Sequence, residues 1–94
     1  MGNSVAIGIN ETIGKRIKQL RKSRGISQRR LAHILGFKSH MSIYYIEKNA
    51  MRNGIKMEHL RNISNEFGIP ISAIIDSDDE GWNKTIDGIL EDNR

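Results

Sequence analysis

Hydrophobic residues recur along most of this chain at spacings of three and four, the period of an amphipathic helix. The first such run is Ile13, Ile17 and Leu20, and most of the residues between them are basic. Thr12 is a good N-cap for this run, and Gly25 suits the left-handed residue that ends a helix. A first helix is therefore expected between Thr12 and Gly25.

The same pattern predicts four more short helices. Ser27 would be the N-cap of the second helix and Gly36 its end. Ser39 would be the N-cap of the third helix, and Gly68 would end the fourth. Their inward faces would be Leu31, Ala32 and Leu35 in the second, Ile43 and Ile46 in the third, Met57, Leu60, Ile63 and Phe67 in the fourth, and Ile71, Ile74 and Ile75 in the fifth. No stretch alternates with the period of a strand, so we expect an all-α, compact bundle of about five short helices.

A last amphipathic helix is predicted after the acidic run DSDDEG, with a stripe formed by Trp82, Ile86, Ile89 and Leu90. This stripe must bury against its own domain or pair with the same helix of a second chain. Because the acidic run separates it from a bundle that already looks complete, dimerisation is favoured. The expected organisation is a flexible arm at 1–10, the bundle at 11–76, an acidic linker at 77–81 and a dimerisation helix at 82–94.

Charge is unevenly distributed along the 94 residues. Residues 1–63 hold 13 Lys and Arg against 3 Asp and Glu, whereas residues 64–94 hold 2 against 8. If the charges only solvated helix faces, this segregation would not be expected. A basic body with an acidic tail indicates that the body binds a polyanion such as nucleic acid.

The residues that metal and enzyme sites need are missing or wrongly spaced. The chain has no cysteine, which removes disulfides, thiolate zinc sites and cysteine nucleophiles. His33, His40 and His59 fall on three different predicted helices, and DSDDEG lacks the spacing of a calcium loop. There is no nucleophile elbow or phosphate-binding glycine loop, and no apolar run of membrane-spanning length. We expect no enzyme activity, cofactor, metal, small-molecule ligand or membrane partner.

The predicted second and third helices are both short, with a tight turn at Gly36 between them. This is the unit that places its second helix in the DNA major groove. SQRRLAHILGF followed by SHMSIYYIEKN resembles the Xre/Cro-like helix-turn-helix of phage repressors and bacterial regulators. The flanking segments IGKRIKQLRKSRGIS and MEHLRNISNEFGIPISAII are also similar to that family. Two departures are an extra residue, Lys38, before the third helix and Arg30 where the family has an acid.

The resemblance implies a lambda-repressor-like fold and a cytoplasmic transcriptional regulator of repressor type, from a phage, mobile element or restriction system. It would bind pseudo-palindromic operator DNA as a homodimer, with the third helix in the major groove. The family's pattern assigns DNA contacts to Gln28, Ser39, His40, Met41, Ser42, Tyr44, Tyr45, Asn49 and Arg52. It also assigns Arg21 and Glu47 to a structural ion pair between the first and third helices.

Arg29 and Lys38 are two further predicted DNA contacts; Arg29 would lie near a phosphate, and the alternative is that its side chain is only solvated. A cation in the first turn of a helix interacts unfavourably with the positive end of the helix dipole. A nearby phosphate would make the local electrostatic energy favourable. For Tyr44 and Tyr45 the alternative is that one packs at the edge of the core.

The rival function is a protein-interaction module, such as an antitoxin or anti-repressor. Ile34 favours it, because the corresponding family position is usually exposed and polar. The basic first half and the polar residues predicted on the third helix favour DNA.

Overall fold

The structure is a computed structural model that describes residues 2–48 and 55–92, with side chains described from Glu11 onward. All of the secondary structure in these residues is helical, which confirms the predicted fold class. The helices are α1 (Gly2–Ser23), α2 (Gln28–Leu35), α3 (Met41–Glu47), α4 (Met57–Phe67), α5 (Ile71–Ile75) and α6 (Asp79–Asp92). None of them is long and apolar enough to cross a bilayer.

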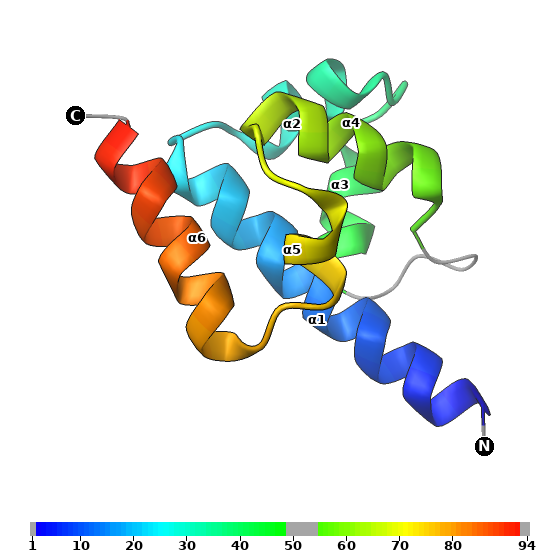
Figure 1. The fold of residues 1–94 in the computed structure, drawn as a ribbon. Helices are drawn as coiled ribbons and strands as arrows, with labels where there is room; N and C mark the ends of the chain where they lie inside the picture. Colours follow the sequence, from blue (N-terminus) through cyan, green and yellow to red (C-terminus); the bar gives the residue numbers. More distant parts are fainter. Residues whose placement is uncertain (1, 49–54, 93–94) are drawn as a thin grey trace.

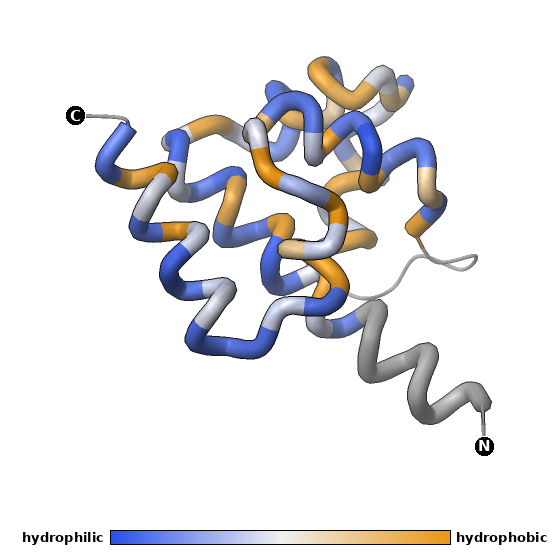
Figure 2. Tube along the Cα trace, in the orientation of Figure 1, coloured by the Kyte–Doolittle hydropathy of each residue, from blue (hydrophilic) through white to orange (hydrophobic). Residues whose placement is uncertain are grey.

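Helix α1 is the central element, since it packs against α3, α5 and α6 (Figure 1). Its apolar stripe lies in a single core with residues from every other helix, and hydrophobic and hydrophilic positions alternate around the helices accordingly (Figure 2). The buried hydrophobic residues are Ile13, Ile17, Leu20, Leu31, Ala32, Leu35, Ile43, Ile46, Leu60, Ile63, Phe67, Ile74, Trp82 and Ile89.

The first helix begins at Gly2, ten residues earlier than the predicted N-cap Thr12. The segment expected to form an arm at 1–10 is therefore helical from Gly2 onward. Once the packed part of a helix has formed, each added residue brings one more backbone hydrogen bond without a new nucleation cost. No proline interrupts the extension.

Most of the predicted helix ends are confirmed. The Ser27 hydroxyl accepts a hydrogen bond from the backbone N–H of Arg30 at 3.0 Å, and Gly36 adopts a φ of 81° at the end of α2. The start of α3 differs, because the helix begins at Met41 and its N-cap position is His40 rather than Ser39.

Two further details of the predicted elements are corrected. The Ser39 hydroxyl still accepts a hydrogen bond, at 3.1 Å, from the backbone N–H of Met41, so it supports the start of α3 from one position further out. Met57, predicted to be buried, is exposed at the first position of α4.

The C-terminal helix packs on its own domain. Trp82 and Ile89 retain only 3% and 7% of their exposure, Ile86 is half-buried against the same core, and only Leu90 of the stripe is exposed. Trp82 and Ile89 thus pack on their own domain, and dimerisation through this stripe stays a prediction. The predicted linker is also too long, because α6 begins at Asp79.

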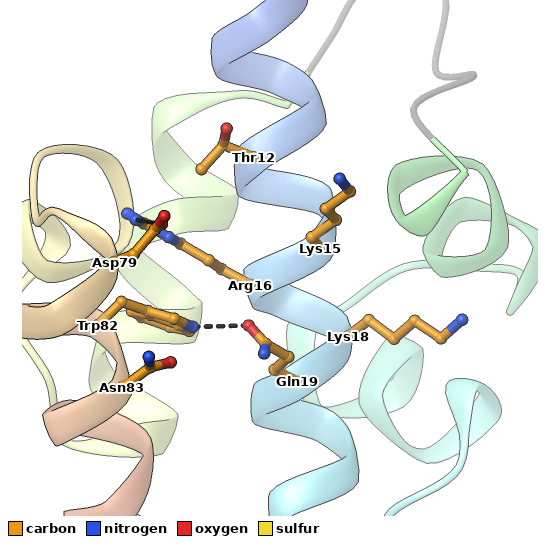
Figure 3. A pocket seen from close by; sticks show the side chains of 8 residues that line it. All are labelled: Thr12, Lys15, Arg16, Lys18, Gln19, Asp79, Trp82 and Asn83. Atoms are coloured by element: carbon orange, nitrogen blue, oxygen red, sulfur yellow. Dashed lines mark hydrogen bonds and ion pairs between the residues drawn. The ribbon is translucent and has the colours of Figure 1, made fainter.

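Arg16 is a buried arginine that joins α1 to the last two helices (Figure 3). Its guanidinium donates hydrogen bonds to the carbonyl oxygens of Ile74 at 2.8 Å and Ser77 at 2.7 Å, at the C-terminal end of α5. A cation is favourable there, because these carbonyls have no partner within the helix. The same guanidinium lies 5.0 Å from the Trp82 ring centroid, and the Trp82 indole N–H donates to Gln19 Oε1 at 2.6 Å. These contacts hold α6 against α1.

Gly14 marks a close approach of α1 to α3. A Cβ atom at this position would overlap the carbonyl oxygen of Ile46. Gly14→Ala is therefore expected to lower the free energy of unfolding by about 1–3 kcal/mol, through overpacking against backbone that cannot move freely. Gly88 on α6 is the matched control, since a Cβ there meets nothing within 4 Å, and Gly88→Ala should stabilise by about 0.5–1 kcal/mol. Urea denaturation of both variants measures the difference, and equal stabilities would contradict the close approach.

Replacing Arg16 tests the link between α1, α5 and α6. Arg16→Met keeps much of the apolar stem but removes the charge-assisted bonds, and should cost about 2–4 kcal/mol of unfolding free energy. Lys18→Met, an exposed neighbour on the same helix, should change stability by less than about 0.5 kcal/mol. Thermal unfolding followed by circular dichroism compares them. An Arg16 variant as stable as the Lys18 variant would show that the capping bonds contribute little.

Candidate nucleic-acid interface

Helices α2 and α3 pack against each other across a turn with fixed geometry. At the end of α2 the backbone N–H of Gly36 donates to the His33 carbonyl at 3.1 Å, and that of Phe37 donates to the Ala32 carbonyl at 2.9 Å. This pair of bonds is the Schellman motif, which requires a left-handed residue and usually places a hydrophobic residue next. The motif turns the chain sharply and sets the direction from which α3 starts.

The predicted ion pair between Arg21 and Glu47 is present. Arg21 Nε lies 2.7 Å from Glu47 Oε2, and Arg21 Nη2 lies 3.0 Å from Glu47 Oε1, so the pair is bidentate. Both side chains are largely buried, at 12% and 4% exposure. Arg21 Nη1 also donates to the Ile26 carbonyl at 3.0 Å. The pair ties the end of α3 to α1 and to the segment that leads into α2.

Gln28, predicted as a DNA contact, belongs in part to this network. It is the first residue of α2, and its amide nitrogen donates to Glu47 Oε1 at 3.1 Å. The bond holds the start of α2 against the end of α3. Sequence reasoning assigned Gln28 to DNA alone, because a contact across 19 positions leaves no trace in local periodicity.

The outer face of α3 carries three large side chains that the core does not use. Met41, Tyr44 and Tyr45 are 37%, 38% and 43% exposed. Neither tyrosine is buried at the core edge, although they contact each other with ring centroids 5.6 Å apart, edge to face. Ser42, the remaining predicted contact within the helix, is half-buried. Met41, Tyr44 and Tyr45 thus lie on a helix that packs against α1 and α2, and they are accessible to a partner.

The other described candidates gather at the corner between α2 and α3. Arg29, Lys38, Ser39 and His40 line one hollow of about 270 Å³, together with Ala32, His33 and Phe37. The structure therefore places the extra residue Lys38 on the same hollow as Arg29, which lies nine positions earlier in the chain. Asn49 and Arg52, also predicted as DNA contacts, lie outside the described residues.

His59 supports this corner from α4, a contact that sequence reasoning missed. Its ring packs against Phe37 with centroids 4.5 Å apart, and its Nδ1 accepts a hydrogen bond from the Lys56 backbone N–H at 3.3 Å. Burial lowers the pKa of His59, partly opposed by the neighbouring Glu58 carboxylate. The low pKa favours the neutral imidazole that this acceptor role requires.

Two alternatives from the sequence can be assessed on the described residues. Ile34, which favoured a protein-binding role, packs half-buried against the core, so its apolar character has a structural explanation. No group of three or more His, Cys, Asp or Glu side chains converges in a way that could hold a metal ion in the part of the chain that the structure describes.

The ion pair under the recognition helix gives a stability prediction. Glu47→Ala leaves the Arg21 guanidinium largely buried without its partner, and should cost about 3 kcal/mol or more. Replacing both residues by apolar ones (Arg21→Met with Glu47→Leu) should cost less than Glu47→Ala alone, since no charge is then stranded. Glu91→Ala, at an exposed acid on α6, is the control. Urea unfolding of the variants distinguishes these outcomes, and a Glu47 variant as stable as the control would contradict the assignment.

Comparison with known proteins identifies the family. The helix-turn-helix domain family matches residues 14–80, more than two thirds of the chain. No curated protein and no solved structure matched the chain. The matched region runs from the close approach at Gly14 to the first turn of α6, and so includes every helix described above at least in part. The chain belongs to the helix-turn-helix domain family, which indicates DNA binding and transcription regulation as its function.

Proposed function

We propose that this protein is a sequence-specific transcriptional regulator that binds double-stranded DNA with α3 in the major groove. The observation that carries the proposal is the outer face of α3, where Met41, Tyr44 and Tyr45 stay exposed on a helix fixed to α1 by the Arg21–Glu47 pair. A reading helix needs this combination, because base recognition depends on side chains held in register with the groove.

Charge around α3 supports DNA as the partner. The two described acids near it are already matched, since Glu47 pairs with Arg21 and Glu11 lies 3.6 Å from Lys15. The exposed cations at the corner have no such partner among the described residues. The exposed cations Arg29 and Lys38 at this corner are therefore available to neutralise phosphate charge.

The side chains of α3 indicate how the sequence would be read. Met41 can pack against a thymine methyl group, and His40 can hydrogen-bond to a purine acceptor or a phosphate. Ser42 can donate or accept, and Tyr45 can hydrogen-bond or stack. The chain has no Arg or Gln at the start of α3 for a bidentate contact with guanine or adenine. We therefore propose readout by apolar contacts, bridging water and DNA shape.

The proposed regulator acts as a homodimer on a pseudo-palindromic operator and represses by occupying promoter DNA. A recognition helix of seven residues spans only a few base pairs, and pairing two copies is the usual way for such a unit to read a long enough site. Since Trp82 and Ile89 are buried in their own domain, the dimer would use other surfaces. Repression by occupancy needs no activity beyond DNA binding.

One observation also favours the rival, a protein-interaction module. Met41, Tyr44 and Tyr45 form a patch rich in apolar atoms, and such residues are enriched at protein interfaces. The surrounding positive charge favours DNA over a protein partner. The two functions differ in one measurable property, the ability to select a DNA sequence.

Selection of duplex DNA from a random pool at physiological salt tests the proposal. The wild-type protein should enrich one sequence family arranged as an inverted repeat. Tyr45→Ala and His40→Ala should each reduce discrimination at one or two base pairs by about 1–3 kcal/mol, because each removes a base contact. Asn83→Ala, on α6 across α1 from α3, should select the wild-type sequence. If the wild type enriches no sequence, or if the α3 variants select the same sequence as the wild type with equal discrimination, the reading function is contradicted.

A further inference from the structure

A second hollow lies between α1 and α6 (Figure 3). Its volume is about 560 Å³, roughly that of nineteen water molecules at about 30 Å³ each, which leaves room for a hydrated organic ion. Helix α1 lines it with Thr12, Lys15, Arg16, Lys18 and Gln19, and α6 lines it with Asp79, Trp82 and Asn83. None of these side chains takes part in the proposed reading of DNA.

The lining of this hollow carries more positive than negative charge. Among its described residues Lys15, Arg16 and Lys18 are cationic, and Asp79 is the one acid. Lys18 forms no ion pair with any described residue, and Lys15 has an exposed contact of 3.6 Å with Glu11. An exposed pair of this kind contributes little to stability, so both ammonium groups are available to an anion. In Figure 3 both lysine side chains extend from α1 away from α6, so they border the outer rim of the hollow.

The largely buried Arg16 adds a hydrogen-bond donor that the fold leaves unused. Its guanidinium has five N–H groups, and the bonds to the carbonyl oxygens of Ala73, Ile74 and Ser77 involve only Nη1 and Nη2. Nε has no hydrogen-bond partner among the described residues, although the side chain is only 6% exposed. Every fully buried side-chain nitrogen and oxygen in the described part of the chain has a partner, so the Arg16 Nε–H is reached from solvent. Since Arg16 lines the hollow, a ligand there can accept this bond.

Gln19 supplies a second donor beside it. Its Oε1 accepts the bond from the Trp82 indole N–H at 2.6 Å, which fixes the orientation of the amide, because only the oxygen can accept. The amide NH₂ group forms no hydrogen bond with a described residue. Figure 3 shows Arg16 and Gln19 reaching from α1 toward α6. Unused donors and positive charge therefore meet at one hollow, which is the combination that binds an oxyanion.

We propose that the hollow between α1 and α6 binds a small organic anion that carries a carboxylate or phosphate group. Its oxygens accept hydrogen bonds from the Arg16 Nε–H and the Gln19 amide, and Lys15 and Lys18 supply positive charge at the rim. The ligand contacts both helices at once, so its binding stabilises the docked position of α6. This site is separate from the reading face of α3, and it does not depend on the protein's binding of DNA.

Trp82 reports on binding directly, since it is the only tryptophan in the chain and lines the hollow. The protein without DNA is titrated at constant ionic strength with citrate and with ribose 5-phosphate, which separate a carboxylate ligand from a phosphate ligand. At least one of the two should produce a saturable change in Trp82 emission and raise the melting temperature, because a ligand that binds only the folded state stabilises it. The cation spermidine should produce neither effect.

Charge variants of opposite sign locate the site. The rim variant Lys15→Gln with Lys18→Gln should weaken anion binding by at least about threefold, because it removes two cations from the rim. Its control, Lys22→Gln with Arg61→Gln, removes the same charge from two exposed residues that do not line the hollow, and should change the affinity less than about twofold.

Asp79→Asn should act in the other direction and tighten anion binding by about two- to fivefold, because it removes the one described carboxylate of the lining. The Asp79 side chain is fully exposed, so the fold should tolerate the change. Asp87→Asn, at an exposed acid of α6 outside the hollow, is the control and should leave the affinity unchanged. Circular dichroism melting confirms that each variant is folded.

Three results would overturn the anion site. The first is the absence of a saturable response to both anions in the millimolar range. The second is equal affinity of the rim variant and its control, or of the Asp79 and Asp87 variants, since the response would then come from general ion screening. The third is a rim variant that loses affinity for duplex DNA while its anion binding is unchanged, which would assign the lysines to the DNA backbone. None of these results bears on sequence selection by α3, so the proposed function would stand.

Discussion

The position of α3 depends on its contact with α1, which is made at two places along α1. At Gly14 the two helices approach so closely that a methyl group would not fit beside the Ile46 backbone. About two turns further along α1, the Arg21–Glu47 pair holds the end of α3 with two short charge-assisted bonds. Gln28 adds the start of α2 to the same carboxylate. One glutamate therefore fixes three helices, and the exposed residues of α3 take their direction from that arrangement.

Much of the positive charge in this protein supports the fold itself. Arg16 caps the end of α5, Arg21 holds Glu47, and the Arg24 guanidinium lies over the Phe67 ring and close to Glu66. The net positive charge of the first 63 residues thus overstates the number of basic side chains that are free to bind a polyanion. The uncompensated cations described around the reading helix are fewer, and they are concentrated at its corner with α2.

Local signals in the sequence predicted the fold well. Apolar spacing located the helices, and Ser27, Gly25, Gly36 and Gly68 marked ends that the structure confirms, because capping depends on residues only a few positions apart. The packing of α6 could not be predicted in this way. The hydrogen bond between Trp82 of α6 and Gln19 of α1 joins residues 63 positions apart, and an amphipathic stripe looks the same whether it covers its own core or that of a second chain.

The candidate site was predictable to the extent that it follows a known pattern. The ion pair came from the resemblance to a family and is present, whereas the roles of Gln28 and His59 depend on contacts between elements. The hollow at the corner needed both Arg29 and the extra residue Lys38, which the turn brings together. Spacing alone placed them on separate elements, and only the path of the backbone between them shows that they share one surface.

Trp82 gives the packing of α6 a useful spectroscopic property. It is the only tryptophan in the chain, and it is buried between α1 and α6 with an arginine over its ring and its indole N–H bonded to Gln19. Its fluorescence therefore reports on a single junction, on the side of α1 away from α3. Release of the C-terminal helix would change the polarity around the indole and with it the fluorescence of Trp82. Events confined to the outer face of α3 would leave this fluorescence largely unchanged. The molecule carries a built-in probe of whether its last helix is docked.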